Sequence, residues 1–141
     1  MSQENVELIR RAFHAFNDRD WNAIAVLFTD DVEWRLIGGF ADVMGSDFKG
    51  HEGVRQWLTD WVDNLGVQTA IEALFDVGDR VAVITRSVAA GGTSGTPAIL
   101  RSGQVYSFRD GRISAVDNYY EVSDVLEAVG MSEQDAHAEP S

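Results

Sequence analysis

Four residues late in the chain have side chains that could act on a small molecule. Gln104 and Tyr106 lie two positions apart in one strand-like run, and Asp117 and Asn118 lie in the next. An amide such as that of Gln104 or Asn118 can orient a carbonyl group or a water molecule. The Tyr106 hydroxyl can donate a hydrogen bond as an acid, and a carboxylate beside apolar residues can have the raised pKa that suits a base. These four are the candidate catalytic residues.

Each of these residues also has a structural interpretation. The two amides can satisfy each other or a buried water, and a buried tyrosine usually bonds its hydroxyl for structural reasons. Asp117 can equally be solvated or paired with an arginine. The turn at residues 109–111 decides which of them share a face, because a one-residue change of register moves every side chain to the other side of a sheet. A two-residue and a three-residue loop both fit this turn.

The elements that must position these residues can be predicted from periodicity. Apolar residues recur at helical spacing over residues 4–17 and 51–65, which predicts two amphipathic helices. Asp20 is a suitable N-cap for a shorter helix between them, carrying Ile24, Leu27 and Phe28. Together these three helices occupy much of the first half of the chain.

Strand-like alternation fills most of the rest. Residues 32–36 alternate between apolar and polar, which predicts a short strand, and residues 37–50 are predicted to form a loop. Two longer alternating runs, at residues 67–75 and 80–89, are separated by a turn, which predicts a hairpin. Two further strands are expected over residues 98–108 and 112–121, followed by a short helix that Ser123 caps. Helices segregated on one side of an antiparallel sheet predict an α+β fold.

Composition limits the possible partners. The chain has 141 residues, which suits one domain over residues 1–130 with a disordered tail over 131–141. A net charge of −12 argues against nucleic acid and anionic membranes, and no apolar run is long enough to span a bilayer. We therefore expect a cytoplasmic protein. With no cysteine and three scattered histidines, no metal and no cofactor are expected.

Several segments together resemble the SnoaL-like branch of the NTF2-like superfamily, which includes ketosteroid isomerase-like proteins. They are residues 5–17 and 27–34, the Gly-His-Glu-Gly-Val-Arg-Gln-Trp run at 50–57, the Phe-Arg-Asp-Gly-Arg-Ile run at 108–113 and the Leu-Glu-Ala-Val-Gly ending at 126–130. The resemblance implies an NTF2-like cone, with three helices from the N-terminal half packed on a curved antiparallel sheet. It also implies an apolar pocket at the open end and a homodimer.

The resemblance also bears on register and reaction. It favours the three-residue loop, which sets Gln104 opposite Val116 and turns Asp117 outward, toward Arg101 or a partner subunit. The base of ketosteroid isomerase-like members falls at Trp34 in this chain, so that reaction is disfavoured. The carboxylates of the related epoxide hydrolase fall near Ser87 and Asn118, so that reaction is disfavoured as well.

The remaining inward residues define a candidate substrate site. Trp57 and Trp61, one helical turn apart, form either an aromatic wall or ordinary core packing. His51, at the start of the same helix, either reaches the pocket entrance as a base or stays on the surface. The expected substrate-binding residues are Trp34, Leu36, Trp57, Trp61, Thr85, Ser87 and Tyr120.

These residues suit a small, hydrophobic, oxygenated molecule as the partner. The leading hypothesis is a cofactor-independent acid/base enzyme of the cyclase, isomerase or dehydratase type. The alternative is a non-catalytic module for ligand binding or dimerisation, which the absence of a clear pocket carboxylate favours.

Overall fold

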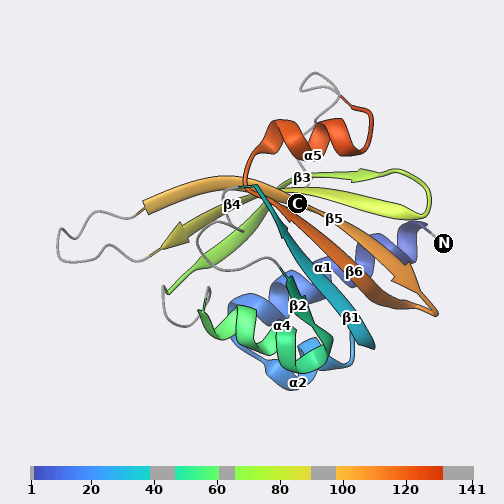
Figure 1. Cartoon of the computed structure of the whole chain (residues 1–141), viewed down its shortest axis with the longest axis vertical. Helices are drawn as coiled ribbons and strands as arrows, with labels where there is room; N and C mark the ends of the chain where they lie inside the picture. The colour runs from blue at the N-terminus through green and yellow to red at the C-terminus, as the bar shows by residue number, and fades with distance from the viewer. Residues whose placement is uncertain (1, 39–46, 61–65, 90–97, 132–141) are drawn as a thin grey trace.

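The computed structural model describes residues 2–38, 47–60, 66–89 and 98–131, which form a curved sheet with helices on both sides. The strands are β1 (Phe28–Ile37), β2 (Asp47–Lys49), β3 (Gln68–Asp76), β4 (Arg80–Ala89), β5 (Ala98–Arg109) and β6 (Arg112–Tyr119). The helices are α1 (Ser2–Asp18), α2 (Trp21–Ala25), α4 (Gly50–Leu58) and α5 (Val122–Ala128). Strand order across the sheet is β2-β1-β6-β5-β4-β3 (Figure 1). The predicted α+β fold is confirmed.

The sheet differs from the expected antiparallel one in two respects. β1 runs parallel to β6, whereas all the other neighbouring pairs are antiparallel. β2 lies inside the segment predicted as a loop and pairs with β1, so that Trp34 faces Phe48 across the two strands. The parallel pair joins segments far apart in the sequence, a pairing that no local pattern predicts.

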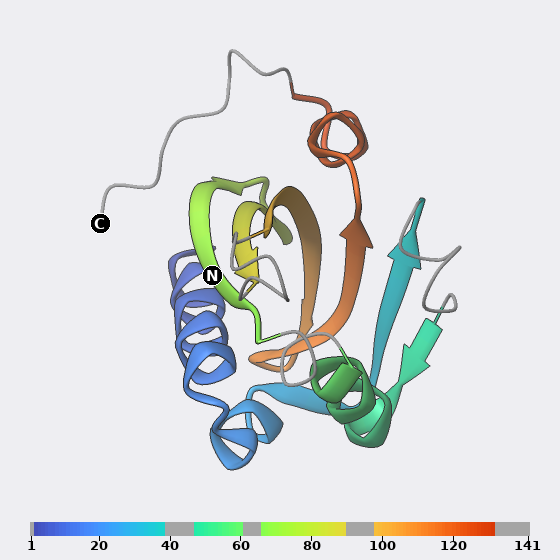
Figure 2. The same ribbon diagram turned by 90° about the vertical axis from the view of Figure 1, so that its left-hand side faces the viewer.

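Opposite faces of the curved sheet bury two separate cores. On the concave face, α1 contributes Ile9, Phe13 and Phe16 to a cluster with inward residues of the sheet such as Trp34 and Val116. On the outer face, α5 packs Val125 and Leu126 over alternate residues of β3, β4 and β5. Figure 2 shows the sheet curving toward α1, α2 and α4, while α5 lies outside the curve. The three N-terminal-half helices therefore close the concave side, where a pocket can form.

Helix boundaries follow the predicted signals only in part. Asp20 caps α2, since its carboxylate accepts a hydrogen bond from the Ala23 amide at 3.1 Å. That helix ends at Ala25, and Phe28, expected within it, begins β1. α4 ends at Leu58, and residues 61–65 of the predicted helix lie outside the described residues. α5 begins at Val122 without a side-chain cap, so the predicted capping role of Ser123 is wrong. Among the residues described, no helix is long and apolar enough to cross a membrane.

The turn between β5 and β6 is tighter than predicted. Arg109 pairs with Arg112, which leaves a two-residue loop of Asp110 and Gly111, and both of these have positive φ values of 54° and 76°. Two consecutive residues with positive φ are typical of the hairpin turn whose twist matches that of the flanking strands. The predicted three-residue loop is therefore wrong.

A β-bulge places the side chains of β5 and β6 on the same faces of the sheet that the three-residue loop predicted for them. Ser107 pairs with Ala115 and Phe108 with Ile113, so Ser114 is an extra residue on β6. Beyond it, Gln104 pairs with Asn118, two positions from its predicted partner. Because a shift of two residues keeps each side chain on its side of the sheet, Gln104 and Asn118 both face the concave side.

Asn17 at the end of α1 covers the free edge of β3. Its amide nitrogen donates to the Thr69 carbonyl at 2.7 Å, and its amide oxygen accepts from the Thr69 amide at 2.9 Å. One side chain thus replaces a neighbouring strand at this position, where an open edge would otherwise expose unpaired backbone groups.

Asn17→Ala is expected to lower the free energy of unfolding by about 1–3 kcal/mol, because it leaves both Thr69 backbone groups without their partner. Chemical denaturation measures this loss. Asn17→Asp should cost at least as much as alanine, since its carboxylate sets an oxygen against the Thr69 carbonyl and adds negative charge at the C-terminal end of α1. A loss for Asn17→Ala below about 0.5 kcal/mol, as for an ordinary surface substitution, would contradict the pairing role.

Candidate functional site

A hollow opens on the concave face between the sheet and helices α1 and α4. It encloses about 490 Å³ of atom-free space, including its open mouth, and the centre of a water molecule can reach about 40 Å³ of this. The lining residues are Phe13, Phe16, Asn17, Trp34, Trp57, Leu58, Val67, Thr69, Ser87, Ser102, Gln104, Tyr106 and Asn118. This space has room for about three water molecules, so a ring-sized ligand requires the lining side chains to move.

Aromatic rings form one half of the lining. The Trp34 ring lies 6.1 Å from Phe16 and 5.9 Å from Trp57, measured between ring centroids. Phe13 lies 6.3 Å from Tyr106 in the same way. Such tilted and edge-on pairs are a favourable arrangement of aromatic rings. This half offers flat apolar surfaces from two helices and two strands.

Neutral polar side chains form the other half. Gln104 donates from its amide nitrogen to the Asn118 amide oxygen at 3.0 Å, across the β5–β6 pair. The hydroxyls of Thr69 and Ser87 lie 3.0 Å apart across β3 and β4. These groups follow from strand alternation, which turns every second residue of neighbouring strands toward the same side.

Three buried polar atoms in this lining have no hydrogen-bond partner among the described residues. They are the indole nitrogen of Trp34, the amide oxygen of Gln104 and the hydroxyl of Tyr106. The three residues are 3%, 8% and 0% exposed, respectively. A buried polar atom without a partner costs about 1–3 kcal/mol, so three such atoms around one hollow call for a physical reason.

Tyr106 is the one titratable residue in the part of the lining that the structure describes. Burial raises the pKa of its hydroxyl far above the ordinary value. The group therefore stays protonated at neutral pH and remains a hydrogen-bond donor. Proton abstraction at neutral pH finds no base among these residues.

Tyr106→Phe is expected to raise the free energy of unfolding by about 1 kcal/mol near pH 7, because it removes an unsatisfied buried hydroxyl without changing the ring. The gain should grow above pH ~10, where a tyrosine in the unfolded chain ionises while the folded one cannot. Urea denaturation at pH 7 and at pH 10.5 measures both effects. A loss of stability at pH 7 would indicate that the hydroxyl has a structural partner.

The predicted site residues are partly brought together. Of these, Trp34, Trp57, Ser87, Gln104, Tyr106 and Asn118 line the hollow. Leu36 is buried in the concave core, and Thr85 is buried with its hydroxyl 3.2 Å from that of Ser102, but neither lines the hollow. Tyr120 follows the end of β6 and is 40% exposed. Trp61 lies outside the described residues.

Asp117 lies on the other face of the sheet from Asn118. Its carboxylate accepts a hydrogen bond from Arg35 Nε at 2.6 Å, between neighbouring positions of β1 and β6. The suggested partner Arg101 instead donates to Glu72 at 2.7 Å. The Asp117 carboxylate therefore does not reach this hollow and cannot act there as a base.

The sequence interpretation missed seven lining residues. Phe13 and Phe16 lie on the apolar stripe predicted over residues 4–17, and periodicity alone does not distinguish a lining residue from a core residue. Thr69 and Ser102 occupy inward positions of alternating strands, a signal that could have found them. The full set is Phe13, Phe16, Asn17, Leu58, Val67, Thr69 and Ser102.

A second hollow adjoins the first between α2 and α4. Its lining shares Phe16 and Leu58 with the first hollow. Trp21 and Arg55 lie on its other side, with the guanidinium carbon of Arg55 at 5.3 Å from the centroid of the Trp21 ring. The Phe16 ring therefore forms part of the wall between the two spaces.

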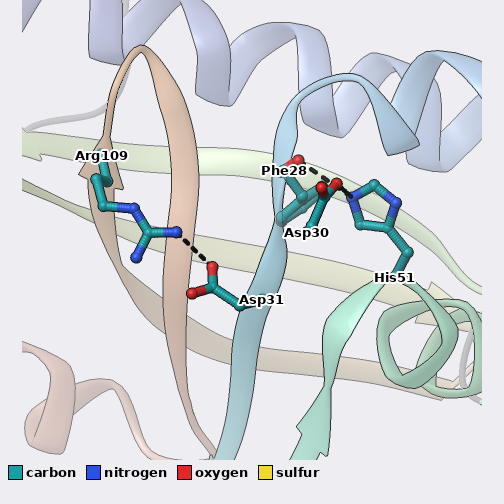
Figure 3. Close-up of polar contacts among 5 residues, drawn as sticks. All are labelled: Phe28, Asp30, Asp31, His51 and Arg109. Atoms are coloured by element: carbon teal, nitrogen blue, oxygen red, sulfur yellow. Dashed lines mark hydrogen bonds and ion pairs between the residues drawn. The ribbon is translucent and has the colours of Figure 1, made fainter.

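His51 lies away from the pocket, near the start of β1. Its ring nitrogen Nε2 lies 3.1 Å from the Phe28 carbonyl and 3.9 Å from the Asp30 carboxylate (Figure 3). Beside it, Arg109 donates to Asp31 and holds the pKa of that exposed carboxyl below its usual value. No group of three or more potential metal ligands occurs in the described segments.

Comparison with known proteins agrees with this architecture. A family model described as a SnoaL-like domain matches residues 9–116. TerC, co-crystallised with polyporic acid, superimposes with a TM-score of 0.73 and 26% identity, over 90% of this chain and 98% of that one. Bal32a, from a soil-derived mobile gene cassette, superimposes with a TM-score of 0.73 and 24% identity, over 83% of this chain and 88% of that one. No curated protein matches the sequence significantly.

A third solved structure shares the fold at lower identity. RV0760c from Mycobacterium tuberculosis, in complex with estradiol-17beta-hemisuccinate, superimposes with a TM-score of 0.71 and 19% identity, over 84% of this chain and 95% of that one. At this identity and at that of Bal32a the likeness shows the fold alone. The family match extends over most of the chain, and the chain therefore belongs to the SnoaL-like family.

Proposed function

We propose that the concave hollow binds a small, hydrophobic molecule that carries oxygen substituents. The observation that carries this proposal is the set of three unpartnered polar atoms, on Trp34, Gln104 and Tyr106, around one aromatic pocket. Apolar pockets with a few convergent polar groups are typical ligand sites, and a ligand would supply the missing hydrogen bonds. TerC and RV0760c, which share the fold, were crystallised with polyporic acid and estradiol-17beta-hemisuccinate, and this supports a ring-containing, oxygen-bearing small molecule here.

The test uses the neutral apolar dye N-phenyl-1-naphthylamine, whose fluorescence rises in an apolar environment. Ser87→Leu should fill the pocket, because Ser87 is buried and lines it. We expect the wild type to bind the dye and this variant to bind it at least about tenfold more weakly.

Arg86→Leu is the matched control, since Arg86 neighbours Ser87 on β4 but is exposed on the opposite face. It should bind the dye as the wild type does, and circular dichroism should show that both variants are folded. Dye binding that Ser87→Leu leaves unchanged would place the ligand elsewhere and overturn the proposal.

Acid/base catalysis of the cyclase, isomerase or dehydratase type is the second candidate, and Tyr106 is the observation that favours it. A tyrosine held protonated in an apolar site can donate to a ketone and acidify the neighbouring C–H group, whose proton a water molecule or hydroxide ion from solvent then accepts. The test is hydrogen–deuterium exchange at the carbon beside the ketone of 1-tetralone. Exchange faster than in buffer, and lost in Tyr106→Phe, would support catalysis. Exchange at the buffer rate would leave binding as the function.

Assembly and location remain predictions. A homodimer is expected from the family resemblance, and sedimentation velocity of the purified protein measures it directly. A cytoplasmic location is expected from the composition and can be tested by fractionation of the source cells.

A further inference from the structure

We propose that the pocket selects the un-ionised form of a ligand that carries both a hydrogen-bond acceptor and a hydroxyl donor. This inference rests on the proposed function. It specifies which groups of the ligand face which residues, and it predicts that binding is lost when the ligand hydroxyl ionises.

The acceptor requirement comes from two unpartnered donors. The Trp34 indole nitrogen can only donate a hydrogen bond, and it has no partner among the described residues. The Tyr106 hydroxyl is fully buried, stays protonated and also lacks a partner there. A ligand with a carbonyl oxygen near these two atoms would satisfy groups that are otherwise buried at a cost.

The donor requirement comes from the paired amides of Gln104 and Asn118. One hydrogen bond joins them, and the Gln104 amide oxygen has no partner among the described residues. Exchanging the oxygen and nitrogen of both amides would preserve that bond in the opposite sense, and the pair would still present one free oxygen. A free amide oxygen requires a donor, which a ligand hydroxyl supplies and an ionised hydroxyl does not.

The charges around this position disfavour an anion. The described residues that line the hollow from α1, α4 and the five strands β1, β3, β4, β5 and β6 carry no charge, and Tyr106 is the one titratable group. Glu33 and Arg35 flank Trp34 on β1, and Asp117 precedes Asn118 on β6; Arg35 and Asp117 pair with each other on the outer face. Arg19, which follows α1, donates to the backbone carbonyls of Asn17 and Val67 and does not itself line the hollow. An ionised ligand would therefore lose its donor and bury a charge without a counter-ion.

The test measures displacement of N-phenyl-1-naphthylamine by three probes that share one two-ring skeleton. The probe 1-tetralone offers an acceptor alone, 5,6,7,8-tetrahydro-2-naphthol has a hydroxyl without the ketone, and 6-hydroxy-1-tetralone carries both groups. We expect 6-hydroxy-1-tetralone to bind roughly 5- to 150-fold more tightly than either of the others. Above the pKa of its hydroxyl, its affinity should fall about tenfold per pH unit, while that of 1-tetralone stays constant.

Two variants test which protein residues contact the ketone and the hydroxyl of the probes. Tyr106→Phe should reduce the affinity of both ketone probes and leave that of the naphthol nearly unchanged. The double variant Gln104→Met/Asn118→Leu should remove the advantage of 6-hydroxy-1-tetralone over 1-tetralone, together with its pH dependence. Arg86→Gln is the control and should leave all three affinities unchanged. The wild-type pH series decides the proposal even where a variant does not fold.

The outcomes separate the two proposals. If the dye does not bind, or binds equally to Ser87→Leu, the proposed pocket function fails and this inference fails with it. If the dye binds in the pocket while 6-hydroxy-1-tetralone shows no advantage, or binds equally well after its hydroxyl ionises, only the present inference is overturned.

Discussion

Gly103→Ala is expected to lower the free energy of unfolding by about 3 kcal/mol, because the new methyl group has no room. A Cβ at this position would lie 2.6 Å from the Val83 carbonyl oxygen and 2.7 Å from Val125 Cγ2. The first contact is with the backbone of the neighbouring strand β4, which cannot rotate away. The second is with α5, which packs on β5 here. Urea denaturation measures the loss.

Gly78→Ala is the matched control for this variant. A Cβ there meets nothing within 4 Å, but the residue has a φ of +92°, so the change introduces backbone strain alone. We expect it to cost about 1–2 kcal/mol. Val125→Ala added to Gly103→Ala should recover little, since the clash with Val83 remains. Equal losses at the two glycines would contradict the argument from crowding.

Much of the fold could be predicted because its elements carry complete local signals. The apolar stripe of α1, the N-cap at Asp20 and the alternation of β3 and β4 each lie within a few turns or one hairpin. The parallel pairing of β1 with β6 could not be predicted, because it joins residues about eighty positions apart. The bulge at Ser114 also lacked a local signal, since it depends on how two long strands fit one curved sheet.

The candidate site was predictable to the extent that strand alternation defines a face. Alternation brings Trp34, Gln104 and Asn118 to the concave side, yet it places Leu36 and Thr85 there as well. Those two are covered by packed neighbours, so facing the concave side differs from lining the hollow. Phe16 was missed for the converse reason, because the stripe of an amphipathic helix does not reveal where packing leaves a gap.

Phe16→Ala is expected to lower the free energy of unfolding by about 3–5 kcal/mol, a large share of the roughly 5–15 kcal/mol typical of a domain. The Phe16 ring is 7% exposed, and its centroid lies 6.3 Å from that of Phe28 and 6.1 Å from that of Trp34. Because it lies in the wall between the two hollows, its loss should also join them. Chemical denaturation measures the first effect and dye titration the second.

The enlarged space should bind N-phenyl-1-naphthylamine more tightly than the wild-type pocket does, because loss of the Phe16 ring leaves room in which the dye can bury more of its own apolar surface. Dye at about 100 times its Kd should then restore close to 2.7 kcal/mol of stability. Phe28→Ala is the control, because Phe28 stacks on Phe16 and is 1% exposed but lines neither hollow. It should lose similar stability without the gain in dye affinity, because its cavity opens inside the core. If both variants gained affinity equally, general loosening of the core would explain the binding, and the wall at Phe16 would have no special role.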